Sequence, residues 1–267
     1  MPMESVTNTD TPADCPIVPV TETLLQVRDL SKAFGGVIAN DAIDLDVPRG
    51  AIVGLIGPNG SGKTTLFNSI VGHHPVDAGS VRFDGREIAG LAPSQVARLG
   101  LVRTFQQAHV YDGMTCLENM QISASHTGEV VGAMFGRFPR DLTDKARSLL
   151  EFVGLTEHAE LAAGSLSYGQ RKLLEFAMAL MNEPKMLLLD EPTAGVNPTL
   201  INSVIDRLRR ANASLGITLL VIEHNMRVIM NLADHIHCLA RGKLLASGPP
   251  AAIRADARVI DAYLGAR

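Results

Sequence analysis

The segment that decides the fold is AIVGLIGPNGSGKTT, residues 51–65. Its first six residues form a continuous apolar run, which is typical of a strand buried on both faces of a sheet. The remainder fits the pattern G-x-x-x-x-G-K-[ST] and leads into a helical segment. The glycines allow successive backbone N–H groups to turn toward one anion, and the following helix adds its positive N-terminal end. The segment therefore predicts a phosphate-binding loop between a buried strand and a helix.

The residues of this loop have expected roles toward a nucleotide and its magnesium ion. Lys63 places a positive charge between the β- and γ-phosphates, Thr64 offers a hydroxyl to Mg²⁺, and Thr65 contacts the α-phosphate. The predicted ATP contacts in the loop are Asn59, Gly60, Ser61, Gly62, Lys63, Thr64 and Thr65. Kinases, GTPases and motor proteins share this pattern, so the loop alone indicates only a P-loop NTPase.

A pair of carboxylates follows a second buried strand. The apolar residues 186–189 precede Asp190 and Glu191. Ligands of open α/β sheets gather at the carboxyl ends of the strands. From that position Asp190 can reach the Mg²⁺ shell through water. Glu191 can accept a proton from the attacking water or orient it, so we expect it to be catalytic together with Lys63.

Patterns elsewhere in the chain predict the domain organisation. Residues 1–22 are rich in Thr, Pro, Asp and Glu without a period, which predicts a disordered tail. Strand patterns occur at 24–27, 43–47 and 217–222, a hairpin at 235–246, and helices at 199–213 and 259–264. The pattern between about 91 and 183 is mostly helical. We expect one α/β domain from residue 23 to 267, whose catalytic core, 23–90 and 184–267, receives an inserted α-helical subdomain at about 91–183.

Composition and charge exclude several classes of protein. The 267 residues carry 24 Lys and Arg against 28 Asp and Glu, a net charge of −4, which disfavours a nucleic-acid-binding protein. Three cysteines without metal-ligand spacing suggest reduced thiols. No apolar run approaches the ~20 residues that a membrane-spanning helix needs. If the protein acts at a membrane, separate chains must supply the spanning helices.

A second motif, LSYGQ at residues 166–170, precedes a helical pattern. Here the sequence resembles the ATPases of ABC transporters, whose signature is LSGGQ. The resemblance implies that Ser167, Gly169 and Gln170 contact the ATP held by a partner chain. It also implies a P-loop NTPase core with a mixed, mainly parallel sheet, an N-terminal antiparallel β subdomain and an inserted helical subdomain. Two chains would then close head to tail on two MgATP molecules.

Other residues match the same family in order and spacing. The resemblance assigns Phe34 to stacking on adenine, Gln106 to Mg²⁺ and the attacking water, and His224 to the γ-phosphate as a catalytic residue. Residues 194–198 correspond to the family's dimer-contact loop. Three residues depart from the usual pattern: Tyr168 replaces a glycine, Phe34 replaces a tyrosine, and Asn197 replaces an aspartate.

Local features resemble the ATPase subunits of branched-chain amino-acid importers in particular. These features are FGGV at 34–37, RTFQ at 103–106, MTCLEN at 114–119, EHNM at 223–226 and AYLG at 262–265. The resemblance implies uptake of branched-chain amino acids or a related small solute, at the cytoplasmic face of a membrane. The implied partners are an identical or sister ATPase, two transmembrane permease subunits and, indirectly, an extracytoplasmic solute-binding protein, with no nucleic acid.

Two other functions compete with this interpretation. A soluble ABC ATPase of translation usually carries two cassettes, and one of DNA repair separates the two motifs by a long coiled coil. This chain has one cassette, and no heptad run lies between its motifs. A small-molecule P-loop kinase would lack both the LSYGQ motif and the histidine at position 224.

Overall fold

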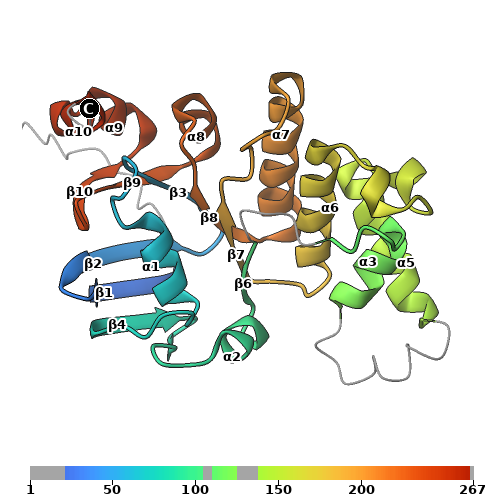
Figure 1. Cartoon of the computed structure of the whole chain (residues 1–267), viewed down its shortest axis with the longest axis horizontal. Coiled ribbons are helices and arrows are strands. Elements are labelled where there is room, and N and C mark those ends of the chain that lie inside the picture. Colours follow the sequence, from blue (N-terminus) through green and yellow to red (C-terminus); the bar gives the residue numbers. More distant parts are fainter. Residues whose placement is uncertain (1–21, 105–109, 125–137, 265–267) are drawn as a thin grey trace, which may run out of the picture.

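The computed structural model describes residues 22–104, 110–124 and 138–264 (Figure 1). The predicted ligand Gln106 and residues 1–21 of the predicted tail lie outside these ranges, so their predictions stay untested. Within the described ranges, no helix combines the length and the apolar character that crossing a membrane requires.

A six-stranded sheet forms the centre of the fold, with the strand order β10-β9-β3-β8-β7-β6. Its strands are β3 (Ile52–Ile56), β6 (Leu101–Arg103), β7 (Met186–Asp190), β8 (Thr218–Ile222), β9 (His235–Ala240) and β10 (Lys243–Gly248). All pairs are parallel except β9 with β10, which form the predicted antiparallel hairpin. Every residue of β3, β7 and β8 is buried, as their apolar runs predicted.

A second, antiparallel sheet is built mostly from the N-terminal part of the chain, with the order β2-β1-β4-β5. Its strands are β1 (Thr23–Phe34), β2 (Val37–Pro48), β4 (Ala78–Phe83) and β5 (Arg86–Glu87). In β2, Ile43, Leu45 and Val47 are buried and alternate with exposed residues, which confirms the predicted half-buried strand.

Alternate residues of the central strands enter two separate cores. Leu187 and Leu189 of β7 belong to a core shared with the helices on one face of the sheet. Met186 and Leu188 belong to a second core that includes α1 and the antiparallel sheet. Because successive side chains of a strand point to opposite faces, one apolar run supports both layers.

The helices lie around these sheets (Figure 1). They are α1 (Lys63–Ile70), α2 (Pro93–Arg98), α3 (Cys116–Ser123), α5 (Arg140–Val153), α6 (Tyr168–Leu180), α7 (Pro198–Leu215), α8 (Met226–Leu232), α9 (Pro250–Ala255) and α10 (Ala257–Leu264), with short 3-10 turns at Thr156–His158 and Ala163–Ser165. Helices α3, α5 and α6 pack against one another and form the part of the molecule farthest from the antiparallel sheet.

One part of the predicted helical region is not helical. Residues 101–103 form β6, which pairs in parallel with β7 at the edge of the central sheet. Three residues are too few to show a period of two, so the sequence pattern could not separate this strand from its helical surroundings. We propose that the helical subdomain begins after Arg103.

Candidate nucleotide site

The loop between β3 and α1 has the shape that a phosphate cradle needs. Its glycines adopt positive φ angles, 149° at Gly57, 76° at Gly60 and 101° at Gly62. A Cβ atom at Gly62 would lie 2.3 Å from the carbonyl oxygen of Ala39, so only glycine fits there. Among the described residues, no side chain caps α1, and its first turn contains no acidic residue. The positive end of α1 therefore suits a bound anion.

Lys63 is folded into this loop and only 5% exposed. Its ammonium group donates to the carbonyl oxygens of Gly57 at 2.7 Å and of Pro58 at 3.0 Å. Burial lowers the pKa of Lys63, while the nearby charges of Glu191 and Asp190 act in the opposite direction. The ammonium group thus lies at the centre of the loop, where phosphate oxygens can replace the two carbonyls as acceptors.

A pocket of about 410 Å³ joins the loop to the ends of two neighbouring strands. Glu191 follows β7, and His224 lies two residues beyond β8. The residues that line this pocket are Val37, Ile38, Ala39, Asn59, Gly60, Ser61, Gly62, Lys63, Thr64, Thr65, Glu191 and His224. The structure therefore brings together the loop and both predicted residues from the strand ends.

Glu191 and His224 contact each other directly. The His224 Nε2 atom lies 2.8 Å from the Glu191 Oε1 atom. Glu191 has a φ of 51°, an uncommon conformation for a residue other than glycine, and its N–H donates to the carbonyl oxygen of Ile222. Strained backbone of this kind is concentrated at functional sites. The contact holds the carboxylate at the edge of the pocket, where it can orient a water molecule.

Asp190 points to a different partner. Its Oδ2 atom accepts from Arg103 Nη2 at 2.7 Å, and both side chains are at most 9% exposed. Arg103 also donates to the Asn68 Oδ1 atom of α1. This ion pair ties β6, β7 and α1 together behind the loop. The sequence assigned no site role to Arg103 or Asn68, although Arg103 begins the RTFQ feature at 103–106.

The acidic residues fit a magnesium ion that is held mainly by nucleotide and water. In the part of the chain that the structure describes, no three His, Cys, Asp or Glu residues form a group that could hold a metal. Magnesium usually binds proteins through one or two side chains, with phosphates and waters completing its shell. Thr64 lines the pocket, as a ligand of such an ion must. Asp190 does not line it and is paired with Arg103, so its expected contact with the Mg²⁺ shell stays a prediction.

Phe34 lies beside the pocket at the turn between β1 and β2, and 44% of its surface is exposed. Its ring contacts His74 edge-on at 5.2 Å between centroids, and Lys32 lies 5.2 Å from the ring centre. The neighbouring Val37 and Ile38 are 70% and 60% exposed. An aromatic and two aliphatic side chains thus form an open apolar surface on which a nucleobase can stack.

The LSYGQ motif lies apart from this pocket. The Ser167 hydroxyl accepts from the Gln170 N–H at 3.4 Å, and the Gln170 side chain accepts from the Ser167 N–H at 2.9 Å. This reciprocal capping box fixes the start of α6. None of the motif's residues lines the pocket of the loop, and α6 and α1 lie in different parts of the molecule (Figure 1). One chain therefore does not bring its two motifs together.

Two residues that depart from the family pattern have clear structural roles. The ring of Tyr168 packs closely on Gly195, in the loop before α7. A Cβ atom added at Gly195 would lie 2.8 Å from this ring. Asn197 caps α7, since its Oδ1 atom accepts from the N–H of Thr199 at 3.1 Å and from its hydroxyl at 2.9 Å. A capping asparagine serves this purpose as well as an aspartate.

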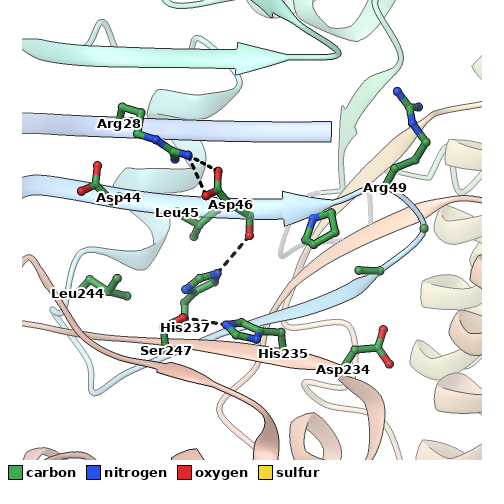
Figure 2. Close-up of a pocket in the computed structure, with 13 residues that line it drawn as sticks. Arg28, Asp44, Leu45, Asp46, Arg49, Asp234, His235, His237, Leu244 and Ser247 are labelled. Atoms are coloured by element: carbon green, nitrogen blue, oxygen red, sulfur yellow. Dashed lines mark hydrogen bonds and ion pairs between the residues drawn. The ribbon is translucent and has the colours of Figure 1, made fainter. Parts of the chain in front are cut away.

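A larger cavity, of about 790 Å³, lies elsewhere, between β2 and the β9–β10 hairpin (Figure 2). None of its lining residues belongs to the predicted nucleotide site. His237 of β9 is 5% exposed there, and its Nε2–H donates to the carbonyl oxygen of Asp46 at 3.3 Å. Burial lowers the pKa of His237 to about 4.

This buried histidine makes the stability of the protein pH-dependent. Its pKa is depressed in the folded state, so the unfolded chain binds the extra proton between about pH 6.5 and pH 4. The contribution of His237 to stability is therefore fully present above pH 6.5 and falls as the pH drops through this window. We expect His237→Gln, which keeps a donor for Asp46, to remove about 2 kcal/mol of the difference in unfolding free energy between pH 7.5 and pH 5. Urea unfolding at the two pH values checks this; an unchanged difference would contradict it.

The fold and the pocket together define a P-loop ATPase of the ATP-binding-cassette class. A family model described as "ABC transporter" matches residues 40–194, and one described as "Branched-chain amino acid ATP-binding cassette transporter" matches residues 243–267. The chain belongs to the ABC transporter ATP-binding family, whose members hydrolyse ATP to energise transport.

Similar proteins cover nearly the whole chain. The branched-chain amino acid transport ATP-binding protein BraF of Pseudomonas aeruginosa is 39% identical, covering 92% of this chain and 99% of its own. LivG of Escherichia coli K12, a protein of the same description, is 37% identical over the same shares. A solved ATP-binding cassette of an ABC transporter in its ADP conformation has a TM-score of 0.82 and 34% identity, covering 92% of this chain and 100% of its own.

Proposed function

We propose that this chain is the ATP-hydrolysing subunit of an importer for branched-chain amino acids or a related small solute. The pocket that joins the glycine loop, Glu191 and His224 carries the ATPase part of the proposal. The named relatives and the matched C-terminal segment support the transport part. No feature of the described residues favours a soluble role outside transport.

In the proposed reaction, the loop and the start of α1 bind the phosphates of ATP, and Phe34 stacks on the adenine. Mg²⁺, when bound, neutralises charge on the β- and γ-phosphates. Glu191 orients the attacking water and accepts its proton. Lys63 and His224 stabilise the charge that develops on the γ-phosphoryl oxygens.

The separation of the two motifs supports a dimer. Each chain would hold one ATP on its loop and present its α6 tip, with Ser167, Gly169 and Gln170, to the ATP of its partner. Hydrolysis then waits for closure of the dimer and removes the phosphate that joins the two halves. Permease subunits at the cytoplasmic face of the membrane would convert opening and closing into transport, with an extracytoplasmic binding protein delivering the solute.

Copurification tests the transport assignment. We expect a tagged form of the chain, expressed at native level, to bring down two polytopic membrane proteins from detergent extracts.

An uptake assay tests the same assignment in cells: deletion of the gene should reduce uptake of radiolabelled leucine or valine at least about tenfold at low concentration. Plasmid-borne wild type should restore uptake, and Glu191→Gln should not. Recovery of the chain with ribosomes or DNA alone would overturn the assignment.

A further inference from the structure

The C-terminal helix α10 contacts the nucleotide loop through one hydrogen bond. The backbone N–H of Gly57 donates to the hydroxyl oxygen of Tyr263 at 2.8 Å. These residues are 206 positions apart in the chain. Tyr263 lies within the C-terminal segment, residues 243–267, that matches the branched-chain amino acid transporter model.

Gly57 is the residue at which β3 turns into the loop. Its φ of 149° and the oxygen of Leu239, which would lie 2.1 Å from an added Cβ, leave room for glycine only. The N–H of Gly57 bonds to Tyr263, and its carbonyl oxygen accepts from the Lys63 ammonium group at 2.7 Å. The peptide unit before Gly57 is therefore held by α10, and the peptide unit after it is held by the phosphate-binding lysine.

The hydroxyl of Tyr263 is suited to a permanent contact. Burial raises the pKa of Tyr263 to about 12, so the hydroxyl stays protonated at any physiological pH. The ring packs against the core that the central sheet shares with the helices on one of its faces. A cavity of about 210 Å³ lies next to this contact. Asn59 and Gly60 of the loop and Asp261 of α10 are among the residues that line it. The hydrogen bond from Gly57 to Tyr263 therefore joins α10 to the entrance of the loop.

We infer that Tyr263 is a positioning residue for nucleotide binding. When phosphate draws the Lys63 ammonium group away, Gly57 and Pro58 lose their bonds to it. The Tyr263 bond does not involve the lysine and keeps the start of the loop in place during this exchange. Holding the loop in its binding conformation lowers the ordering cost of binding. The inference deepens the proposed nucleotide role of the loop and rests on it.

Tyr263→Phe tests this inference, because it removes the hydroxyl and keeps the ring. We expect Kd for MgADP by calorimetry and KM for ATP to rise roughly fivefold, the factor that one net hydrogen bond is worth, with kcat within about twofold. Tyr111→Phe, the same change at a tyrosine that is 58% exposed, is the matched control and should alter neither.

The outcomes separate three cases. A lower unfolding temperature for Tyr263→Phe, with Kd and KM within about twofold of wild type, would show that Tyr263 only attaches α10 to the core, and would overturn the inference. Failure of wild type itself to bind MgADP would instead refute the proposed role of the loop. Should the variant not fold, hydrogen exchange of wild type decides: the Gly57 amide should be protected with and without MgADP, and rapid exchange in either state contradicts a permanent anchor.

Discussion

Glu191→Gln is expected to bind MgATP as tightly as wild type and to lose at least ~10²-fold in turnover, the scale of a lost acid–base group. The amide keeps the size of the side chain and a possible contact with His224, 2.8 Å away in the wild type. It cannot accept a proton from the attacking water. Phosphate release under saturating ATP measures turnover, and calorimetry measures binding. Near-normal phosphate release would show that another group activates the water.

The same variant also tests the shared site. Because ATP persists in Glu191→Gln, we expect it to form a stable dimer with MgATP, seen by light scattering, and to remain monomeric with MgADP. Adding Ser167→Arg places a bulky cation at the exposed tip of α6, remote from the chain's own pocket. The double variant should bind nucleotide as the single variant does and stay monomeric. Equal loss of binding and dimerisation would argue against a site divided between two chains.

Lys63→Ala is expected to weaken ATP binding on the order of 10²-fold, so that no binding is detected at micromolar ATP. The buried ammonium group is the central cation of the loop, and charge-assisted hydrogen bonds of this kind contribute roughly 1.5–3 kcal/mol each. Removing it leaves the carbonyl oxygens of Gly57 and Pro58 without the lysine donor. Binding is measured by calorimetry with MgATP.

Lys243→Ala is the matched control for this loss of charge. Lys243 forms an exposed ion pair with Asp41 at 3.0 Å, and 68% of its side chain is exposed. Exposed pairs contribute at most about 1 kcal/mol, so this variant should bind ATP as wild type does. Micromolar binding by Lys63→Ala would mean that the backbone amides of the loop hold the phosphates without the lysine.

Much of the fold followed from local patterns. The apolar runs of β3, β7 and β8, the alternation in β2 and the glycine-lysine motif before α1 lie where the sequence predicted them. These runs and motifs depend on neighbouring residues and can be recognised within a short window.

The α7 helix, Pro198–Leu215, is longer at both ends than the predicted 199–213. Its ends are set by the cap at Asn197 and the glycine at 216, and both lie outside the apolar stripe on which the prediction rested.

Contacts between distant parts of the chain could not be recognised in this way. Residues 101–103 can be identified as the strand β6 only from their pairing with β7, which lies more than 80 residues away in the chain. The same holds for the ion pair of Arg103 with Asp190 and for the hydrogen bond of Tyr263 to Gly57. The local sequence marks these residues as parts of motifs, but the partner of each one is set by how the sheet and helices pack.

The sequence by itself determined the class of chemistry, because the order and spacing of glycines, lysine and carboxylates are local requirements of phosphate binding. Only the tertiary structure decided that Glu191 contacts His224 directly and that Asp190 is held by Arg103. The LSYGQ motif lies apart from the loop of its own chain, as the resemblance implied. The reason is physical: parallel strands bring their carboxyl ends to one edge of the sheet, while the helices that carry the other motif pack elsewhere.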